Sequence, residues 1–243
     1  MSAIESRSNA KFKAWCTLLD GRGIKKAGRA LISGRKLVDE FLARAPELAE
    51  DLLVPPKGDE LVPPAGVRVH HLSSPLFREL DVMGTGTPLL IVRTEPLADW
   101  QSEPPQGLQL IVALSDPGNL GALLRSAEAF SVSRVILTEE ACSPFLPKSI
   151  RASGGASLRL SLARTGPLAK LQISDAFALD MGGEDLSRFT WPKDLYLLLG
   201  EEGRGVPETL GLRRLSIRMG GHTESLNATT AAAIAMYSYR GQN

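Results

Sequence analysis

Two continuous apolar runs in the second half of the chain set the strongest limit on its fold. They are LQLIVAL at 108–114 and DLYLLLG at 194–200, each about the length of one strand. Runs without polar alternation indicate strands buried on both faces, which are typical of parallel sheets. Helix-like and strand-like segments alternate around them, and the chain closes with an alanine-rich helical pattern at 225–240. The sequence therefore predicts an α/β fold with a mostly parallel sheet and helices on both faces.

Residues 95–107 divide the chain. Their sequence, EPLADWQSEPPQG, is rich in Pro, Glu and Gln and has no helical or strand period, which is typical of a linker. Ahead of them, short strand-like runs alternate with helical patterns, as expected for a small α/β domain. We therefore predict a first domain at 1–94, a linker at 95–107 and a second domain at 108–243.

Composition excludes several classes of protein. Cys16 and Cys142 are too few for a disulfide framework or a four-ligand zinc site, and their scarcity fits a reducing cytoplasm. No apolar run reaches the ~18 residues of a membrane span. Residues 1–13 lack the apolar core of a signal peptide. We therefore expect a cytoplasmic protein without a membrane segment.

The histidines do not suggest a metal site. His70 and His71 are adjacent on a predicted strand, so their side chains point to opposite faces, and His222 lies far away in the sequence. No serine–histidine–aspartate triad can be assembled either. We expect no bound metal.

The net charge of +1 conceals a basic N-terminal segment. Residues 1–36 hold nine basic and two acidic residues, a net of +7 that leaves −6 for the rest of the chain. A basic patch suits a polyanion such as RNA, and the alternative is a solvated surface without a partner. The residues that we expect to contact RNA are Arg7, Lys11, Lys25, Lys26, Arg29 and Arg35.

Three polar or glycine-rich loops follow predicted strands of the second domain. They are SDPGN at 115–119, GEEGRG at 200–205 and GGHTESLN at 220–227. Because ligands of parallel sheets bind at the carboxyl ends of the strands, these loops form the candidate site. The second loop lacks the dinucleotide fingerprint and no P-loop occurs, which argues against oxidoreductases and P-loop nucleotidases. Taken singly, each loop could be only a turn or a cap, with Thr223 or Ser225 capping the last helix.

The order of these loops resembles a known family. Residues 114–127 (LSDPGNLGALLRSA), 199–205 (LGEEGRG) and 217–227 (IRMGGHTESLN) resemble the three motifs of the SpoU (TrmH-type) RNA 2′-O-ribose methyltransferases of the SPOUT superfamily. Residues 147–156 are similar to the family's intermediate segment, and the resemblance covers 108–240. The N-terminal part is more loosely similar to the ribosomal-protein-L30-like domain that often binds substrate in this family.

The resemblance implies a fold, a reaction and partners. The C-terminal domain would be a trefoil-knotted methyltransferase domain, S-adenosylmethionine the cofactor and a homodimer the assembly that completes the site. The enzyme would methylate the ribose 2′-hydroxyl of a nucleotide in structured RNA, with ribosomal RNA favoured over transfer RNA. A non-catalytic RNA-binding module on the same scaffold is the alternative. The family often has Asn where Glu201 stands, so we carry the family's Glu onto Glu202.

The family's site residues map onto matching positions of this chain. The implied catalytic residues are Asn119, Arg125, Glu202, Ser225 and Asn227. The implied cofactor-binding residues are Leu199, Gly200, Gly203, Ile217, Met219, Ser225 and Leu226.

Arg125 has two possible roles in such a reaction. It follows Asn119 by one and a half turns of the predicted helix, so we expect both side chains at one pocket mouth. Arg is an awkward base because its pKa exceeds ~12, and the alternative is a charged guanidinium that binds phosphate and lowers the hydroxyl pKa. The sequence does not choose between them.

The last predicted helix is a candidate dimer contact, because small residues permit close approach and large apolar ones suit burial. Its candidate contact residues are Ala231, Ala232, Ala233, Ile234, Ala235, Met236, Tyr237 and Tyr239.

Overall fold

The chain forms two compact units. The computed structural model describes residues 3–57, 61–201, 203–221 and 225–243. The N-terminal unit comprises Met1–Pro96 and Ser143–Leu158, and the C-terminal unit comprises Leu97–Cys142 and Arg159–Asn243. We predicted residues 143–158 within the second domain, but they pack with the first unit.

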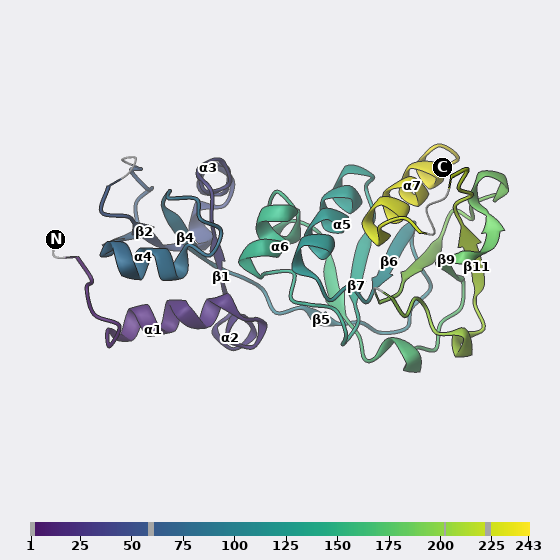
Figure 1. Cartoon of the computed structure of the whole chain (residues 1–243), viewed down its shortest axis with the longest axis horizontal. Coiled ribbons are helices and arrows are strands. Elements are labelled where there is room, and N and C mark those ends of the chain that lie inside the picture. Colours follow the sequence, from purple (N-terminus) through teal and green to yellow (C-terminus); the bar gives the residue numbers. More distant parts are fainter. Residues whose placement is uncertain (1–2, 58–60, 202, 222–224) are drawn as a thin grey trace. The chain divides into compact units, whose positions relative to one another are not determined.

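The N-terminal unit is a four-stranded sheet with helices on both faces (Figure 1). Its strands, in the spatial order β1-β4-β2-β3, are β1 (Arg29–Ile32), β2 (Ala49–Val54), β3 (Arg68–His71) and β4 (Leu89–Arg93). Strand β4 pairs antiparallel with β1 and β2, and β2 pairs parallel with β3. Its helices are α1 (Ala10–Cys16), η1 (Thr17–Leu19), α2 (Gly21–Ala27), α3 (Arg35–Arg44), η2 (Pro46–Leu48), α4 (Ser74–Leu80), α6 (Pro147–Ala152) and η3 (Ala156–Leu158).

Apolar side chains assign each helix to a face of this sheet. Helices α1, α2 and α4 cover one face, and α3 and α6 cover the other. Ile150 of α6 is fully buried in one cluster with Ala30, Ile32 and Val38. This burial explains why residues 143–158 belong to the N-terminal unit.

A close backbone contact fixes the turn from η1 into α2. Asp20 caps α2 by accepting hydrogen bonds from the backbone amides of Arg22 (2.8 Å) and Gly23 (2.9 Å). A Cβ atom at Gly23 would lie 1.8 Å from the carbonyl oxygen of Thr17. Only glycine fits there, so α2 has a fixed place against η1 although two glycines weaken its helix propensity.

The C-terminal unit is built on a seven-stranded sheet in which every pairing of described strands is parallel. In the spatial order β11-β9-β10-β6-β7-β8-β5, its strands are β5 (Ala98–Asp99), β6 (Leu108–Val112), β7 (Arg134–Leu137), β8 (Leu162–Arg164), β9 (Ala176–Asp185), β10 (Leu195–Leu199) and β11 (Arg213–Ser216). Its helices are α5 (Pro117–Ala129), η4 (Leu168–Lys170), η5 (Leu186–Arg188), η6 (Glu208–Leu210) and α7 (Ala228–Arg240). The predicted α/β class with a parallel sheet is confirmed. Strand β5 lies within the predicted linker.

The two apolar runs at 108–114 and 194–200 form β6 and β10. These strands are neighbours at the centre of the sheet, and each of their residues is buried. Helices α5 and α7 lie side by side on one face of the sheet (Figure 1). The other face is covered by the short helices η4 and η6 and by irregular segments, with Leu168 and Val206 in its apolar cluster. Within the described ranges, none of the helices has the length and apolarity that a membrane crossing requires.

Candidate functional site

The three predicted loops follow strands that end at one edge of the C-terminal sheet. Residues 113–116 join β6 to α5, residues 200–207 follow β10, and residues 217–227 lead from β11 into α7. Strands β6 and β10 are adjacent, and β11 lies beyond β9. Since the strands run parallel, the loops gather at the carboxyl edge, where α/β sheets bind ligands.

Two asparagines bring the first and third loops together. The backbone N–H of Asn119 donates to the side chain of Asp116, the cap residue of α5, over 2.8 Å. The side chain of Asn227 caps α7 by accepting from the backbone N–H of Thr229 over 2.8 Å. The Nδ2 of Asn227 donates to the Oδ1 of Asn119 over 3.3 Å. The N-termini of two 13-residue helices therefore converge, and their partial positive charges favour an anionic or strongly polar ligand.

The cap of α7 differs from the prediction. Asn227, not Ser225, holds the cap position, and Thr223 lies outside the described residues. An Asn side chain accepts from the helix amide as well as a hydroxyl does. Ser225 is thereby left exposed on the approach to α7, beside Leu226, whose exposed fraction is 37%.

The second loop folds tightly back on itself. A Cβ atom at Gly200 would lie 2.0 Å from the carbonyl carbon of Gly205 and 2.5 Å from the nitrogen of Val206. The Gly205 amide donates to the Glu201 carbonyl over 3.0 Å and closes the loop. We expected Gly200 to admit a cofactor, but the loop's own backbone already requires glycine there.

The other residues that we expect to bind the cofactor lie in this loop, directly before it, or in the segment after β11. Leu199 is buried at the end of β10, and Gly203 is exposed with φ +89° and nothing within 4 Å of a Cβ atom. Ile217 packs against the main core, and Met219 is half-buried. Glu202, a predicted catalytic residue, lies outside the described residues.

Arg125 lies on the surface of α5. Its side chain is exposed, whereas Leu124 and Ala127 on the same helix are buried. Six residues along an α-helix correspond to about 9 Å of rise and a rotation of about 120° away from Asn119. Because an arginine side chain is long, this rotation leaves the expectation that Arg125 and Asn119 share one pocket mouth as a prediction.

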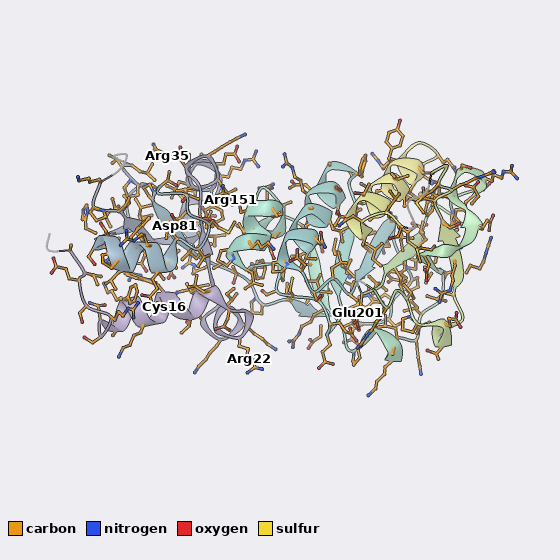
Figure 2. The ribbon with its side chains drawn as sticks, viewed as in Figure 1. Cys16, Arg22, Arg35, Asp81, Arg151 and Glu201 are labelled. Carbon is orange, nitrogen blue, oxygen red and sulfur yellow. The ribbon has the colours of Figure 1, made fainter. Side chains whose placement is uncertain are left out.

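The six predicted RNA contacts fall into two groups. Arg7, Arg29 and Arg35 pair with Glu79 (2.8 Å), Glu50 (2.6 Å) and Asp39 (2.9 Å). Lys11, Lys25 and Lys26 are exposed, and no acidic group among the described residues lies within ion-pair distance of them. Lys13 of α1 and Arg22 of α2 are likewise exposed and have no acidic group of the described residues within ion-pair distance. Figure 2 shows Arg22 and Arg35 on opposite sides of the N-terminal unit.

An ionic cluster around the buried Asp51 accounts for His70. Asp51 accepts hydrogen bonds from Arg68 (2.7 and 3.0 Å) and His70 (2.8 Å), and the ring of Trp15 lies 5.0 Å from that of His70. Burial raises the pKa of Asp51, but the hydrogen bonds and charges of Arg68 and His70 outweigh it and hold the pKa below its usual range. No group of three or more metal-ligating side chains occurs in the described part of the chain.

Asp180 and Arg214 form a pair that the sequence did not predict. Arg214 on β11 pairs with Asp180 on β9, and its Nη2 donates to the carbonyl oxygen of Val206 over 2.8 Å. The only sequence signal was the acidic residue Asp180 directly after the apolar residues 177–179 (FAL) of β9, which alone predicts no partner.

The chain is similar to known RNA methyltransferases along its whole length. It is 29% identical to the 23S rRNA (guanosine(2553)-2′-O)-methyltransferase RlmP of Bacillus subtilis, over 99% of this chain and 100% of that protein. It is 40% identical to the ribosomal RNA small subunit methyltransferase G 2 of Syntrophobacter fumaroxidans, over 97% of this chain. The chain spans only 48% of that relative, whose name therefore describes a protein about twice as long.

Solved structures share the fold. A TrmH-family protein from Porphyromonas gingivalis superposes with a TM-score of 0.77 at 25% identity, covering 98% of this chain and 100% of that one. The SpoU methyltransferase AviRb of Streptomyces viridochromogenes, solved with its cofactor AdoMet, has a TM-score of 0.75 at 24% identity, covering 96% of this chain and 98% of that one. The sequence pattern of the SpoU rRNA Methylase family matches residues 109–237, which include all three loops. The resemblance seen in the sequence is confirmed, and the chain belongs to the SpoU rRNA Methylase family.

Proposed function

We propose that this protein transfers a methyl group from S-adenosylmethionine to the ribose 2′-hydroxyl of a nucleotide in RNA, with ribosomal RNA favoured over transfer RNA. The observation that carries the proposal is the contact of Asn119 with Asn227. It joins the first and third family motifs at the carboxyl edge of the sheet. The name of the Bacillus relative specifies a 2′-O position in 23S rRNA, which supports both the atom and the RNA class.

The carboxyl edge fits an adenosyl cofactor. It offers half-buried apolar side chains at Ile217 and Met219, and backbone at Gly203 and Gly220 with nothing within 4 Å of a Cβ atom. The residues proposed to hold the cofactor are Leu199, Gly200, Gly203, Ile217, Met219, Ser225 and Leu226. When bound, S-adenosylmethionine supplies an electrophilic methyl carbon.

The protein's own groups must then align the hydroxyl and remove its proton. Asn119 and Asn227 can hold the ribose by hydrogen bonds without adding charge. Arg125 either accepts the proton or, as a guanidinium, binds the substrate phosphate and stabilises the developing alkoxide. Ser225 and Glu202 complete the proposed catalytic set.

Two measurements test the proposed reaction. Calorimetry with S-adenosylhomocysteine should show micromolar binding to the full chain. Incubation with ribosomal RNA and S-adenosylmethionine, followed by mass spectrometry of the nucleosides, should yield a 2′-O-methyl nucleoside. Absence of cofactor binding would favour the non-catalytic RNA-binding module, and a methylated base would refute the ribose assignment.

We also propose that the N-terminal unit, which the resemblance likens to an L30-type domain, supplies most of the RNA affinity. Five exposed cations that have no acidic partner among the described residues lie on α1 and α2, namely Lys11, Lys13, Arg22, Lys25 and Lys26, whereas α3 carries one such cation, Arg44. Arg22 and Lys26 are four residues apart on α2, and such like-charge pairs destabilise a helix unless an anion compensates them. This face is therefore a better RNA surface than that of α3, where Arg35 is already paired with Asp39.

Neutralising the α2 cations should weaken RNA binding. For Lys25→Gln with Lys26→Gln, we expect lower affinity and a salt slope reduced by about 0.7–0.9 for each phosphate that is no longer neutralised. The matched control is Arg35→Gln with Lys36→Gln, because these cations pair with Asp39 and Glu40 on their own helix. RNA titrations at two salt concentrations compare them. If neither double variant changed the affinity or the salt slope, the RNA surface would lie elsewhere, either around Lys148 and Arg151 of the N-terminal unit or around Arg204 of the C-terminal unit.

We further propose a homodimer through the C-terminal unit. Ala232, Ala235, Met236 and Tyr239 of α7 face the protein's own core, so they are unavailable to a partner. Ile234 and Tyr237 remain exposed, at 38% and 71%, one helical turn apart. These two residues support a second copy as the occupant of this face.

Light scattering tests the homodimer. The wild-type chain should be a dimer at micromolar concentration, and Tyr237→Glu should shift it to monomer by burying a charge in the contact. Ser187→Glu, on the surface of η5, is the control for added charge. A wild-type monomer would overturn the proposal.

We also propose that the C-terminal unit contains the trefoil knot that the family resemblance implies. After the edge strand β11, the chain returns to the centre of the sheet, where α7 packs beside α5. This return from the edge of the sheet to its centre supports a chain threaded through a loop.

A further inference from the structure

The loop that follows β10 is closed by one backbone hydrogen bond, but its glycines give the backbone little intrinsic conformational preference. Three of its residues are Gly200, Gly203 and Gly205, and the last two adopt φ values of +89° and +67°. Glycine-rich segments lose much conformational entropy when ordered, so a fixed loop needs external contacts. The Gly205 amide bonds only within the loop, to the Glu201 carbonyl.

Arg214 ties the end of this loop to two strands. Its Nη2 donates to the Val206 carbonyl over 2.8 Å, and its Nη1 donates to Asp180. Both charged side chains are only 22% exposed. Hydrogen bonds from a guanidinium are stronger than neutral ones, and half-burial reduces their screening by water. Val206 also buries its side chain in the core, so the carbonyl is presented at a fixed position.

The strands are shaped to present Asp180 to the loop. The register of β9 and β11 shifts between Arg214 and Leu215, so residues 179–183 form a bulge with no paired residue in β11. A Cβ atom at Gly183 would lie 2.4 Å from the carbonyl oxygen of Arg214, so the bulge closes tightly against that residue. Asp180 Oδ2 lies 3.5 Å from the position of a Cβ atom on Gly205. The carboxylate therefore sits against the loop as well as against Arg214.

We propose that Arg214 is a positioning residue for cofactor binding, acting through the Val206 carbonyl and Asp180 to hold the loop after β10 in its binding conformation. This inference rests on the proposed function, since it takes the loop as part of the cofactor site. Arg214 does not itself touch substrate or cofactor in this role. Its hydrogen bonds restrict the loop backbone, which the glycines leave free to adopt several conformations.

The test compares Arg214→Met with Arg213→Met in the full chain. Arg213 is the adjacent residue on β11; it pairs with Glu184 of β9 over 2.7 Å, and its guanidinium lies over the rings of Phe177 and Phe189. Arg214→Met should accelerate hydrogen exchange of the Gly205 amide and weaken S-adenosylhomocysteine binding by about tenfold, as expected when a charge-assisted hydrogen bond is removed. The KM for S-adenosylmethionine should rise with it, while the KM for RNA should stay unchanged. Arg214→Lys, which keeps the charge but not the fork of donors, should recover part of the binding.

Several outcomes would overturn the inference. One is wild-type Gly205 exchange and cofactor affinity in Arg214→Met. Another is an equal effect in Arg213→Met, which would mean that any loosening of the sheet edge weakens binding. If the wild-type chain bound no cofactor, the proposed function would fail, whereas the Gly205 exchange would still report whether Arg214 orders the loop.

Discussion

Arg125→Ala should reduce methyl transfer by about 100- to 1000-fold, the usual effect of removing one transition-state contact from a catalytic site. The expected reduction arises in the chemical step, whether Arg125 accepts the proton or stabilises the alkoxide. Its side chain is exposed on α5 and alanine is the best helix former, so the free energy of unfolding should change little. Single-turnover methylation with saturating cofactor measures the effect.

Two further variants separate the roles of Arg125. Arg125→Lys keeps a positive charge and should retain part of the rate if the guanidinium acts by electrostatics. Arg240→Ala removes an exposed arginine from the last turn of α7 and controls for the removal of charge. Wild-type turnover in Arg125→Ala would show that the residue has no catalytic role.

Gly200→Ala should abolish measurable cofactor binding while leaving the central sheet folded. The new Cβ atom would lie 2.0 Å from the Gly205 carbonyl carbon, and both groups are backbone, so the loop has to move. Overpacking of this kind typically costs about 1–3 kcal/mol of stability. Calorimetry with S-adenosylhomocysteine measures the binding, and circular dichroism with a thermal scan measures the fold.

Gly166→Ala is the matched control for that substitution. Gly166 also follows a strand of the same sheet, but a Cβ atom there would have nothing within 4 Å. The Gly166→Ala variant should bind the cofactor with the affinity of the wild type. If Gly200→Ala also bound normally, the tight fold of the loop would be irrelevant to the cofactor.

The central sheet could be predicted because burial leaves a direct signal in the sequence. Strands β6 and β10 are buried on both faces, and their apolar runs show it without any knowledge of their partners. The sequence has no comparable apolar pattern at helices α1 and α2. Each has seven residues, and α2 contains Gly23 because of a contact with Thr17 rather than because of helix propensity.

The site was harder to predict because its contacts join distant segments. Asn119 and Asn227 are 108 residues apart, and only the family resemblance linked them before the fold did. For the basic N-terminal segment, the sequence showed the charges but not the acidic residues that pair with them. Its net charge was visible in the sequence, but the acids that neutralise Arg7 and Arg29 come from α4 and β2.

The membership of residues 143–158 in the N-terminal unit affects how the chain responds to cleavage. The chain passes between the two units at Pro96–Leu97, Cys142–Ser143 and Leu158–Arg159. A single protease cut at 101–106 would leave α6, with its buried Ile150, on the C-terminal fragment but packed in the core of the N-terminal one. The nicked fragments should therefore remain associated and co-elute under native conditions. A graft of residues 1–96 onto another protein would leave an empty space where Ile150 packs, so a transplantable N-terminal unit has to carry both pieces.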